Sequence, residues 1–99
     1  MPNKNYLKGV RFERDVIKML ELRGFATTRA SGSHSQWDVI GYRVDQKPLF
    51  IQCKTTSDPA LGRRMIKQFK ETIVPSKYYH QALYVKAGRG MIHLMEVTV

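Results

Sequence analysis

The 99-residue sequence contains a single cysteine, Cys53, and no long hydrophobic run. One cysteine cannot form an internal disulfide. The sequence also has neither the apolar stretch of a secretion signal nor an apolar segment of transmembrane length. We therefore expect an intracellular, cytoplasmic protein without membrane association, built as one domain over residues 1–99. A chain this short buries a modest core, which favours pairing with a second copy.

Acidic residues are scarce, because eight Asp and Glu face 17 Lys and Arg, for a formal net charge of +9. A surface with this charge attracts polyanions, of which nucleic acid is the commonest in a cell. A merely basic soluble protein is the alternative. An anionic membrane is a poorer partner, since no segment is both strongly basic and amphipathic with exposed large apolar residues.

Hydrophobic spacing, caps and turn residues predict elements in the order α-β-β-β-α-β-β. The expected helices cover about residues 8–23 and 59–73, and the expected strands cover 25–31, 37–44, 48–56, 80–87 and 91–99. Gly24 ends the first helix, and Asp58 caps the second, with Pro59 at its first position. This order indicates an α/β fold with a mixed central sheet flanked by helices.

The first helix carries a carboxylate on its apolar side. At 100° per residue, Phe12, Val16, Ile17 and Leu20 share one arc, and Glu13 falls inside that arc. A carboxylate aimed toward a core needs a cation, hydrogen bonds or a metal ion. The alternative is a glutamate at the edge of the face, paired with a lysine. The second helix has an apolar stripe of its own, made of Leu61, Met65, Phe69 and Ile73.

The third strand, "LFIQCKTT" at residues 49–56, places two polar side chains on one face. Gln52 and Lys54 project beside Phe50, because side chains alternate along a strand. Cys53 takes the other face and is expected to be a small buried hydrophobe, since no histidine is placed to activate it. A lysine on a core-like strand requires a negative or solvated partner.

Asp38 and Glu13 can supply that partner. A hairpin brings Asp38 beside Lys54, and a helix packed on the sheet lowers Glu13 onto the same place. Two carboxylates can hold Mg²⁺ or Mn²⁺, the Gln52 amide oxygen can add a ligand, and Lys54 can stabilise charge on a phosphate or help to deprotonate water. Taken singly, Asp38 could cap a turn and Lys54 could snorkel from an edge strand. Taken together, they indicate phosphodiester hydrolysis.

The hairpin register decides which way Asp38 faces. A four-residue turn that pairs Asp45 with Pro48 would set Asp38 opposite Thr55, on the face away from Lys54. The hydrolase hypothesis therefore predicts a loop of odd length, for instance Asp45 to Lys47, or a bulge near Asp38.

At these residues the pattern resembles the PD-(D/E)XK nuclease superfamily, whose core has the order αβββαβ. The stretch "KGVRFERDVIKMLELRGFATTRASGSHSQWDVIG" is similar to the archaeal Holliday-junction resolvases, and the likeness is good over residues 8–56. It implies a restriction-endonuclease-like fold. It further implies a metal site at Glu13, Asp38 and Gln52, a catalytic Lys54, a loop serine (Ser31 or Ser33) near the scissile phosphate, and a phosphate-contacting Arg29.

Two positions depart from that pattern. Trp37 stands where the family has a proline before the aspartate, and Gln52 replaces the glutamate of the E-x-K motif. "IQCK" is instead similar to the methylation-dependent restriction endonucleases of the same superfamily, whose motif often carries glutamine. The replacement removes one negative charge, so we expect weaker metal binding or reliance on Glu13.

The resemblance and the charge together predict a homodimeric, Mg²⁺-dependent nuclease that resolves four-way DNA junctions by paired nicks. The alternatives are a restriction-like or repair nuclease acting on linear duplex DNA, and a catalytically silent DNA-binding module. Phe69, Leu94 or Met95 would contribute to the dimer surface. Expected DNA contacts are Lys8, Arg11, Arg14, Arg29, Ser31, His34, Arg63, Arg64 and Lys67. For His34, a solvated loop position is the alternative.

Overall fold

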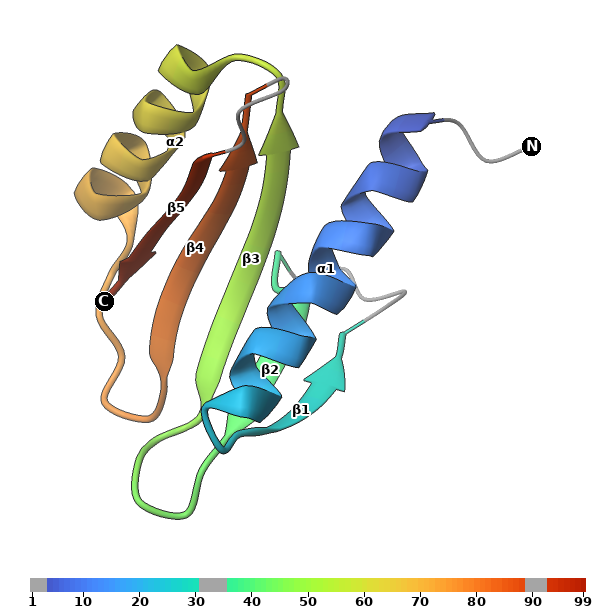
Figure 1. The fold of residues 1–99 in the computed structure, drawn as a ribbon. Helices are drawn as coiled ribbons and strands as arrows, with labels where there is room; N and C mark the ends of the chain where they lie inside the picture. Colours follow the sequence, from blue (N-terminus) through green and yellow to red (C-terminus); the bar gives the residue numbers. More distant parts are fainter. Residues whose placement is uncertain (1–3, 31–35, 89–92) are drawn as a thin grey trace.

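A computed structural model describes residues 4–30, 36–88 and 93–99, which form one five-stranded sheet with a helix on each face (Figure 1). The predicted order of elements is confirmed. The elements are α1 (Lys4–Leu22), β1 (Ala26–Arg29), β2 (Val39–Tyr42), β3 (Leu49–Thr56), α2 (Pro59–Thr72), β4 (His80–Ala87) and β5 (His93–Thr98).

The sheet is mixed, as predicted, and its strands lie in sequence order β1-β2-β3-β4-β5. The pairs β1–β2, β2–β3 and β4–β5 are antiparallel, whereas β3 and β4 are parallel. Parallel neighbours need a long crossover connection, and α2 supplies it. Figure 1 shows α1 beside β1, β2 and β3, and α2 beside β4 and β5.

Each face of the sheet has its own core, because successive side chains of a strand alternate. On the α1 side, Phe12, Val16 and Leu20 pack against a group that includes Val39 and Ile51, and all are nearly inaccessible to solvent. Burying a side chain of this size contributes roughly 1.5–3 kcal/mol. This core fixes the position of α1, and hence of Glu13, over β2 and β3.

On the α2 side, Phe69 packs against a group that includes Leu83 and Val85, with Met65 and Ile73 at the margin. The predicted start of this helix is confirmed, since the Asp58 carboxylate accepts a hydrogen bond of 2.9 Å from the N–H of Ala60.

The predicted apolar stripe of α2 is wrong at Leu61, which is 37% exposed. The neighbouring Gly62 is buried in its place, and a Cβ built there would lie 3.1 Å from the Cβ of Ala87. The close approach of helix and strand leaves little room for a side chain at Gly62. Leu61 is therefore turned toward solvent.

Two differences from the expected element boundaries bear on the site. The first helix begins at Lys4, several residues before the expected start, and ends at Leu22, where Gly24 adopts a φ of +90°. The second strand is shorter than expected and begins at Val39, so Trp37 and Asp38 precede it. Asp38 therefore lies where regular pairing with β3 ends.

Candidate active site

The candidate site lies where β2 begins beside the second half of β3. Val39 is the partner of Ile51, yet the N–H of Asp38, one residue earlier, donates to the carbonyl of the same Ile51 at 2.8 Å. Two successive residues thus face one, which is the pattern of a β-bulge. The connection between the paired residues Gly41 and Leu49 also has an odd number of residues (42–48). The odd connection and the bulge are therefore both present. Because the two shifts cancel in the alternation of faces, Asp38 is turned to the backbone of Cys53, and the expectation that it faces Lys54 is wrong.

The bulge brings the side chain of Asp38 against the backbone of β3. Its Oδ2 accepts a hydrogen bond of 2.8 Å from the N–H of Cys53. In a regular ladder, a backbone N–H of β3 donates to a backbone carbonyl of the neighbouring strand. Here the N–H of Cys53 donates to the side chain of Asp38. The carboxylate is thereby held beside Cys53, between Gln52 and Lys54 in the chain.

Glu13 reaches the same region from α1 and is paired with a cation, as its place in the apolar arc required. Arg29, the last residue of β1, donates from Nε to Oε1 at 3.3 Å and from a terminal nitrogen to Oε2 at 3.5 Å. The side chain of Glu13 is only 16% exposed, against 37% for Arg29. The partner of Glu13 is therefore an arginine in a two-pronged arrangement, and not the lysine considered as an alternative.

The thiol of Cys53 lies close enough to both carboxylates to respond to their charge. Burial raises the pKa of Cys53 from 9.0 to about 12, and the negative charges of Asp38 and then Glu13 add to the effect. Asp38 is held at this point of β3 by its hydrogen bond to Cys53, and Glu13 on α1 lies near enough to add to the shift. The thiol stays protonated at neutral pH, which agrees with its expected non-catalytic character.

Gln52 and Lys54 flank Cys53 in sequence but face the other side of the sheet. They line a cavity of about 390 Å³ between β3 and α2, which we call the α2 cavity. Its lining includes Gln36, Gln52, Lys54, Gln68, Phe69 and Leu83. The predicted residues thus lie at one level of β3, with Glu13 on the α1 side, Asp38 at the strand edge, and Gln52 and Lys54 on the α2 side. Among the described side chains, no ion pair joins Lys54 to either carboxylate.

The amino-acid sequence matches the model of a known protein family. The family described as "Archaeal holliday junction resolvase (hjc)" matches residues 4–70 of the chain, a stretch that contains Glu13, Asp38, Gln52 and Lys54. The chain belongs to the archaeal Holliday junction resolvase family. No curated protein matches it.

The structure of a family member has the same fold. The chain is similar to the Archaeoglobus fulgidus Hjc, a Holliday junction resolvase from an archaeal hyperthermophile, with a TM-score of 0.57 and 20% sequence identity. The alignment covers 89% of this chain and 71% of the Archaeoglobus protein. The predicted restriction-endonuclease-like fold is confirmed. As a resolvase, the protein is a structure-selective nuclease for four-way DNA junctions, and its family requires a divalent metal ion.

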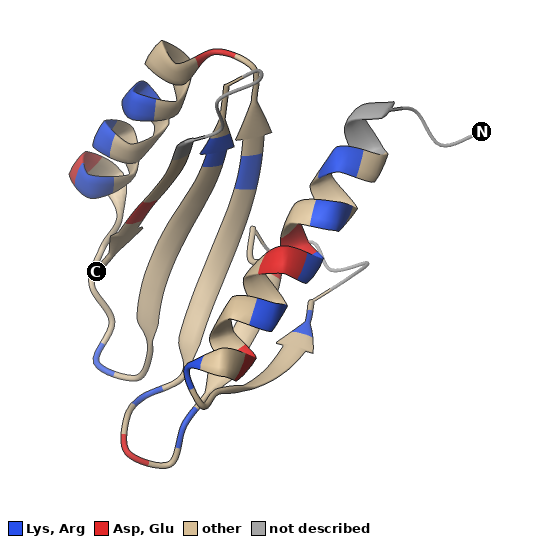
Figure 2. Ribbon diagram, viewed as in Figure 1, with Lys and Arg blue, Asp and Glu red and all other residues tan. Residues whose placement is uncertain are grey.

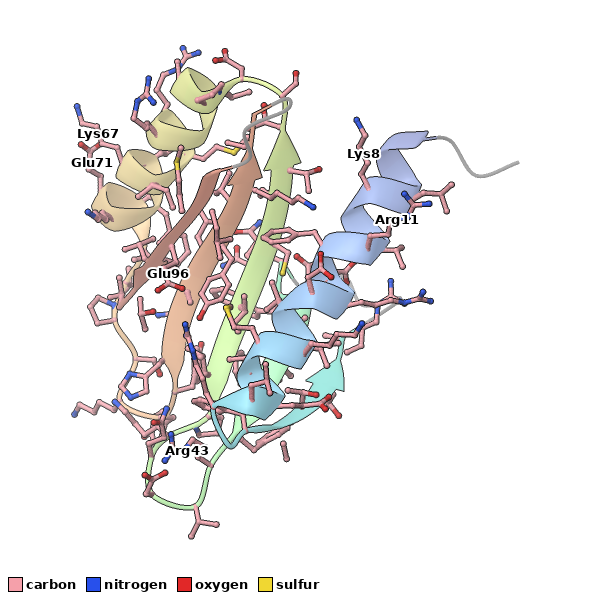
Figure 3. The ribbon with its side chains drawn as sticks, viewed as in Figure 1. Lys8, Arg11, Arg43, Lys67, Glu71 and Glu96 are labelled. Atoms are coloured by element: carbon pink, nitrogen blue, oxygen red, sulfur yellow. The ribbon has the colours of Figure 1, made fainter. Side chains whose placement is uncertain are left out.

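The expected DNA contacts of this resolvase fall on both helices. Lys8, Arg11 and Arg14 are exposed on α1. On α2, Arg63, Arg64 and Lys67 are exposed, as is Lys70. Figure 2 shows basic positions along each helix, and Figure 3 shows Lys8, Arg11 and Lys67 projecting outward. Ser31, Ser33 and His34 lie outside the described residues. Within the described part of the chain, no helix is long and apolar enough to cross a membrane.

The donor set for a metal ion in this resolvase is small. Among the residues that the structure describes, no group of three or more His, Cys, Asp and Glu side chains could hold a metal ion. Glu13 and Asp38 still offer hard oxygen donors, the type that Mg²⁺ and Mn²⁺ prefer. The donor chemistry fits such an ion. Because Gln52 stands in place of the glutamate of the E-x-K motif, the predicted set carries two negative charges and not three.

The sequence did not reveal the part that three residues play in this region. The backbone N–H of Cys53 orients Asp38, and no side-chain pattern can reveal a backbone donor. Gln36 and Gln68 line the α2 cavity beside Gln52. Gln68 lies one residue before Phe69 of the predicted stripe, so the helical spacing could have indicated its place at the margin of the core.

Proposed function

We propose that Glu13 and Asp38 hold one divalent cation, Mg²⁺ or Mn²⁺, at the point where β2 and β3 separate. The support is their convergence on Cys53 from two elements. Each carboxylate already makes a hydrogen bond, yet an ionised carboxylate has about four acceptor positions, so capacity for a ligand bond remains. Gln52, which the family resemblance assigns to the same site, faces the α2 side of the sheet, and Gln52→Glu tests whether it contributes a ligand. When bound, such an ion polarises the phosphate and favours ionisation of water.

The remaining residues would act on the phosphate and the water. Lys54, exposed at the mouth of the α2 cavity, would stabilise the negative charge that develops on the phosphate or help to deprotonate the attacking water. Arg29 orients Glu13 and carries a partly exposed guanidinium that can also meet a phosphate. A loop serine, Ser31 or Ser33, is assigned a place near the scissile phosphate by the family resemblance alone.

We further propose a homodimer, because a two-fold branched substrate cut by paired nicks calls for two symmetric sites. Of the residues expected at the dimer surface, Phe69 and Met95 pack within the α2-side core of one subunit. Leu94 on β5 is 50% exposed and stays available for a partner. Family membership favours junctions over linear duplex DNA. Membership of a nuclease family likewise disfavours the silent DNA-binding module considered as an alternative.

The test is cleavage of a labelled four-way junction and of a linear duplex with the same arms, in Mg²⁺, in Mn²⁺ and in chelator. Asp38→Asn removes a charge but keeps an oxygen that can accept from Cys53, so the fold should survive. Asp58→Asn is the matched control, because asparagine caps a helix as well as aspartate does. We expect paired, metal-dependent nicks that Asp38→Asn slows by about 100-fold or more.

Asp58→Asn should cut at the wild-type rate. Tight junction binding without cutting in either metal would overturn the enzymatic proposal in favour of a binding module. Equal cutting of the duplex would overturn the proposed preference for junctions. Cutting by Asp38→Asn at the wild-type rate would remove Asp38 from the metal site.

A further inference from the structure

The α2 cavity has a composition that metal binding and phosphate chemistry do not explain. Its floor is apolar, formed by Phe69 and Leu83, which are 7% and 3% exposed. Its rim carries the amide side chains of Gln36, Gln52 and Gln68. The volume of about 390 Å³ falls within the range of roughly 300–1,000 Å³ that is usual for small-molecule sites.

This combination matches the chemistry of a nucleobase. A base is flat and apolar on its faces and carries hydrogen-bond donors and acceptors along its edge. Apolar side chains can contact the faces, and each amide offers both a donor and an acceptor to the edge. Lys54, at the same cavity, adds the cation that an attached phosphate needs.

We propose that the α2 cavity binds one nucleobase that leaves the stack of the DNA strand being cut, while Lys54 meets the adjoining phosphate. This inference rests on the proposed function, because it places the base beside the site of cleavage. Its lining includes no acidic side chain among the described residues, so neither a metal ion nor a cationic side chain is a suitable occupant. Amides serve every base edge, so little base preference is expected.

A base pocket also accounts for selectivity between branched and linear DNA. Extruding a base costs a few kcal/mol in a continuous duplex, and least where pairing or stacking is already broken. A junction offers bases with weakened stacking at the crossover, whereas extrusion from a duplex requires the full free energy of unstacking and unpairing. The cavity would thus contribute to recognition of structure without reading sequence.

Thr72→Phe tests the proposal, because Thr72 lines the cavity from the exposed last residue of α2 and a phenyl ring there would fill the space. Leu61→Phe is the matched control, since it places the same ring at an exposed position of α2 that is not part of the lining. Gln68→Leu is a second variant that keeps the size of the side chain and removes an amide. Thermal unfolding of each variant confirms that the fold is kept.

The probe is a four-way junction with 2-aminopurine at the crossover, bound in chelator so that it stays intact. Wild type and Leu61→Phe should raise the fluorescence on binding, as the base leaves the stack. Thr72→Phe should lower that rise at least three-fold, with junction affinity changed less than three-fold, and Gln68→Leu should lower it partly. An equal rise with Thr72→Phe, or no rise with wild type, would overturn the proposal.

Cleavage in Mg²⁺ separates this inference from the proposed function. A fluorescence rise without any metal-dependent cutting would leave the base pocket in place and remove the nuclease proposal. Metal-dependent cutting without a fluorescence rise would support the nuclease and overturn the base pocket.

Discussion

Raising the pH should weaken the fold through Cys53, and the size of the effect follows from the position of the thiol. Burial first, then Asp38 and Glu13, raise the pKa of Cys53 from 9.0 to about 12. The unfolded chain loses this proton near its ordinary value, so between the two values the folded state binds more protons. The stability given by the neutral thiol is complete below the unfolded pKa and is lost as the pH rises through the folded pKa. The slope is at most about 1.4 kcal/mol per pH unit, or ~4 kcal/mol over the whole interval.

The assay is urea unfolding of wild type and Cys53→Ala from about pH 7 to about pH 11. Lysines and tyrosines titrate in both proteins, so the difference between the two free energies of unfolding isolates the thiol. The advantage of wild type should be constant up to about pH 9 and then shrink by roughly 1.4 kcal/mol per unit. In an Asp38→Asn background the loss should begin at the same pH but end at a lower one and be smaller in total, because the folded-state pKa of Cys53 is raised less without that negative charge. A difference that stays constant up to about pH 11 would refute the burial of this thiol beside the two carboxylates.

Four further substitutions test the fold and the site. Gly62→Ala should lower the free energy of unfolding by about 1–3 kcal/mol, since its Cβ would meet that of Ala87 at 3.1 Å. Gly9→Ala, with nothing within 4 Å of the new Cβ, should raise it by roughly 0.5–1 kcal/mol. Thermal unfolding that ranks the two variants the other way would contradict the packing. Arg29→Met should lower the free energy of unfolding by no more than about 1 kcal/mol, because its ion pair with Glu13 is partly exposed. It should nevertheless slow junction cutting about 10-fold or more. An unchanged cutting rate would remove Arg29 from the site. Gln52→Glu should lower the Mg²⁺ concentration for half-maximal cutting, and an unchanged concentration would show that residue 52 is no ligand.

Local patterns in the sequence were sufficient for the order of elements and for the need of a partner at Glu13. The cap at Asp58 and the turn at Gly24 depend on neighbouring residues only, and both are as expected. The parity of the β2–β3 connection could be deduced from the requirement that Asp38 approach the third strand. The apolar arc of α1 likewise required a partner for Glu13.

Other features depend on contacts between distant segments, which spacing along the chain does not encode. The partner of Glu13 is Arg29, a cation on another element, because β1 pairs with β2 and passes beside α1. Gly62, and not Leu61, lies on the inner side of α2 because β4 approaches the helix closely. That Gln52 faces α2, away from the helix that carries Glu13, follows from which face each helix covers.

This separation of faces gives a physical reason for an amide at position 52. Gln52 lies in the α2 cavity with the apolar side chains of Phe69 and Leu83, while the carboxylates of Glu13 and Asp38 approach Cys53. A carboxylate at position 52 would increase attraction for a cation, but part of its hydration would be lost against the apolar floor. It could also only accept hydrogen bonds, whereas an amide both donates and accepts. Gln52→Glu should therefore strengthen metal binding and weaken the fluorescence signal of an extruded base, so the two effects of one substitution can be measured on the same junction.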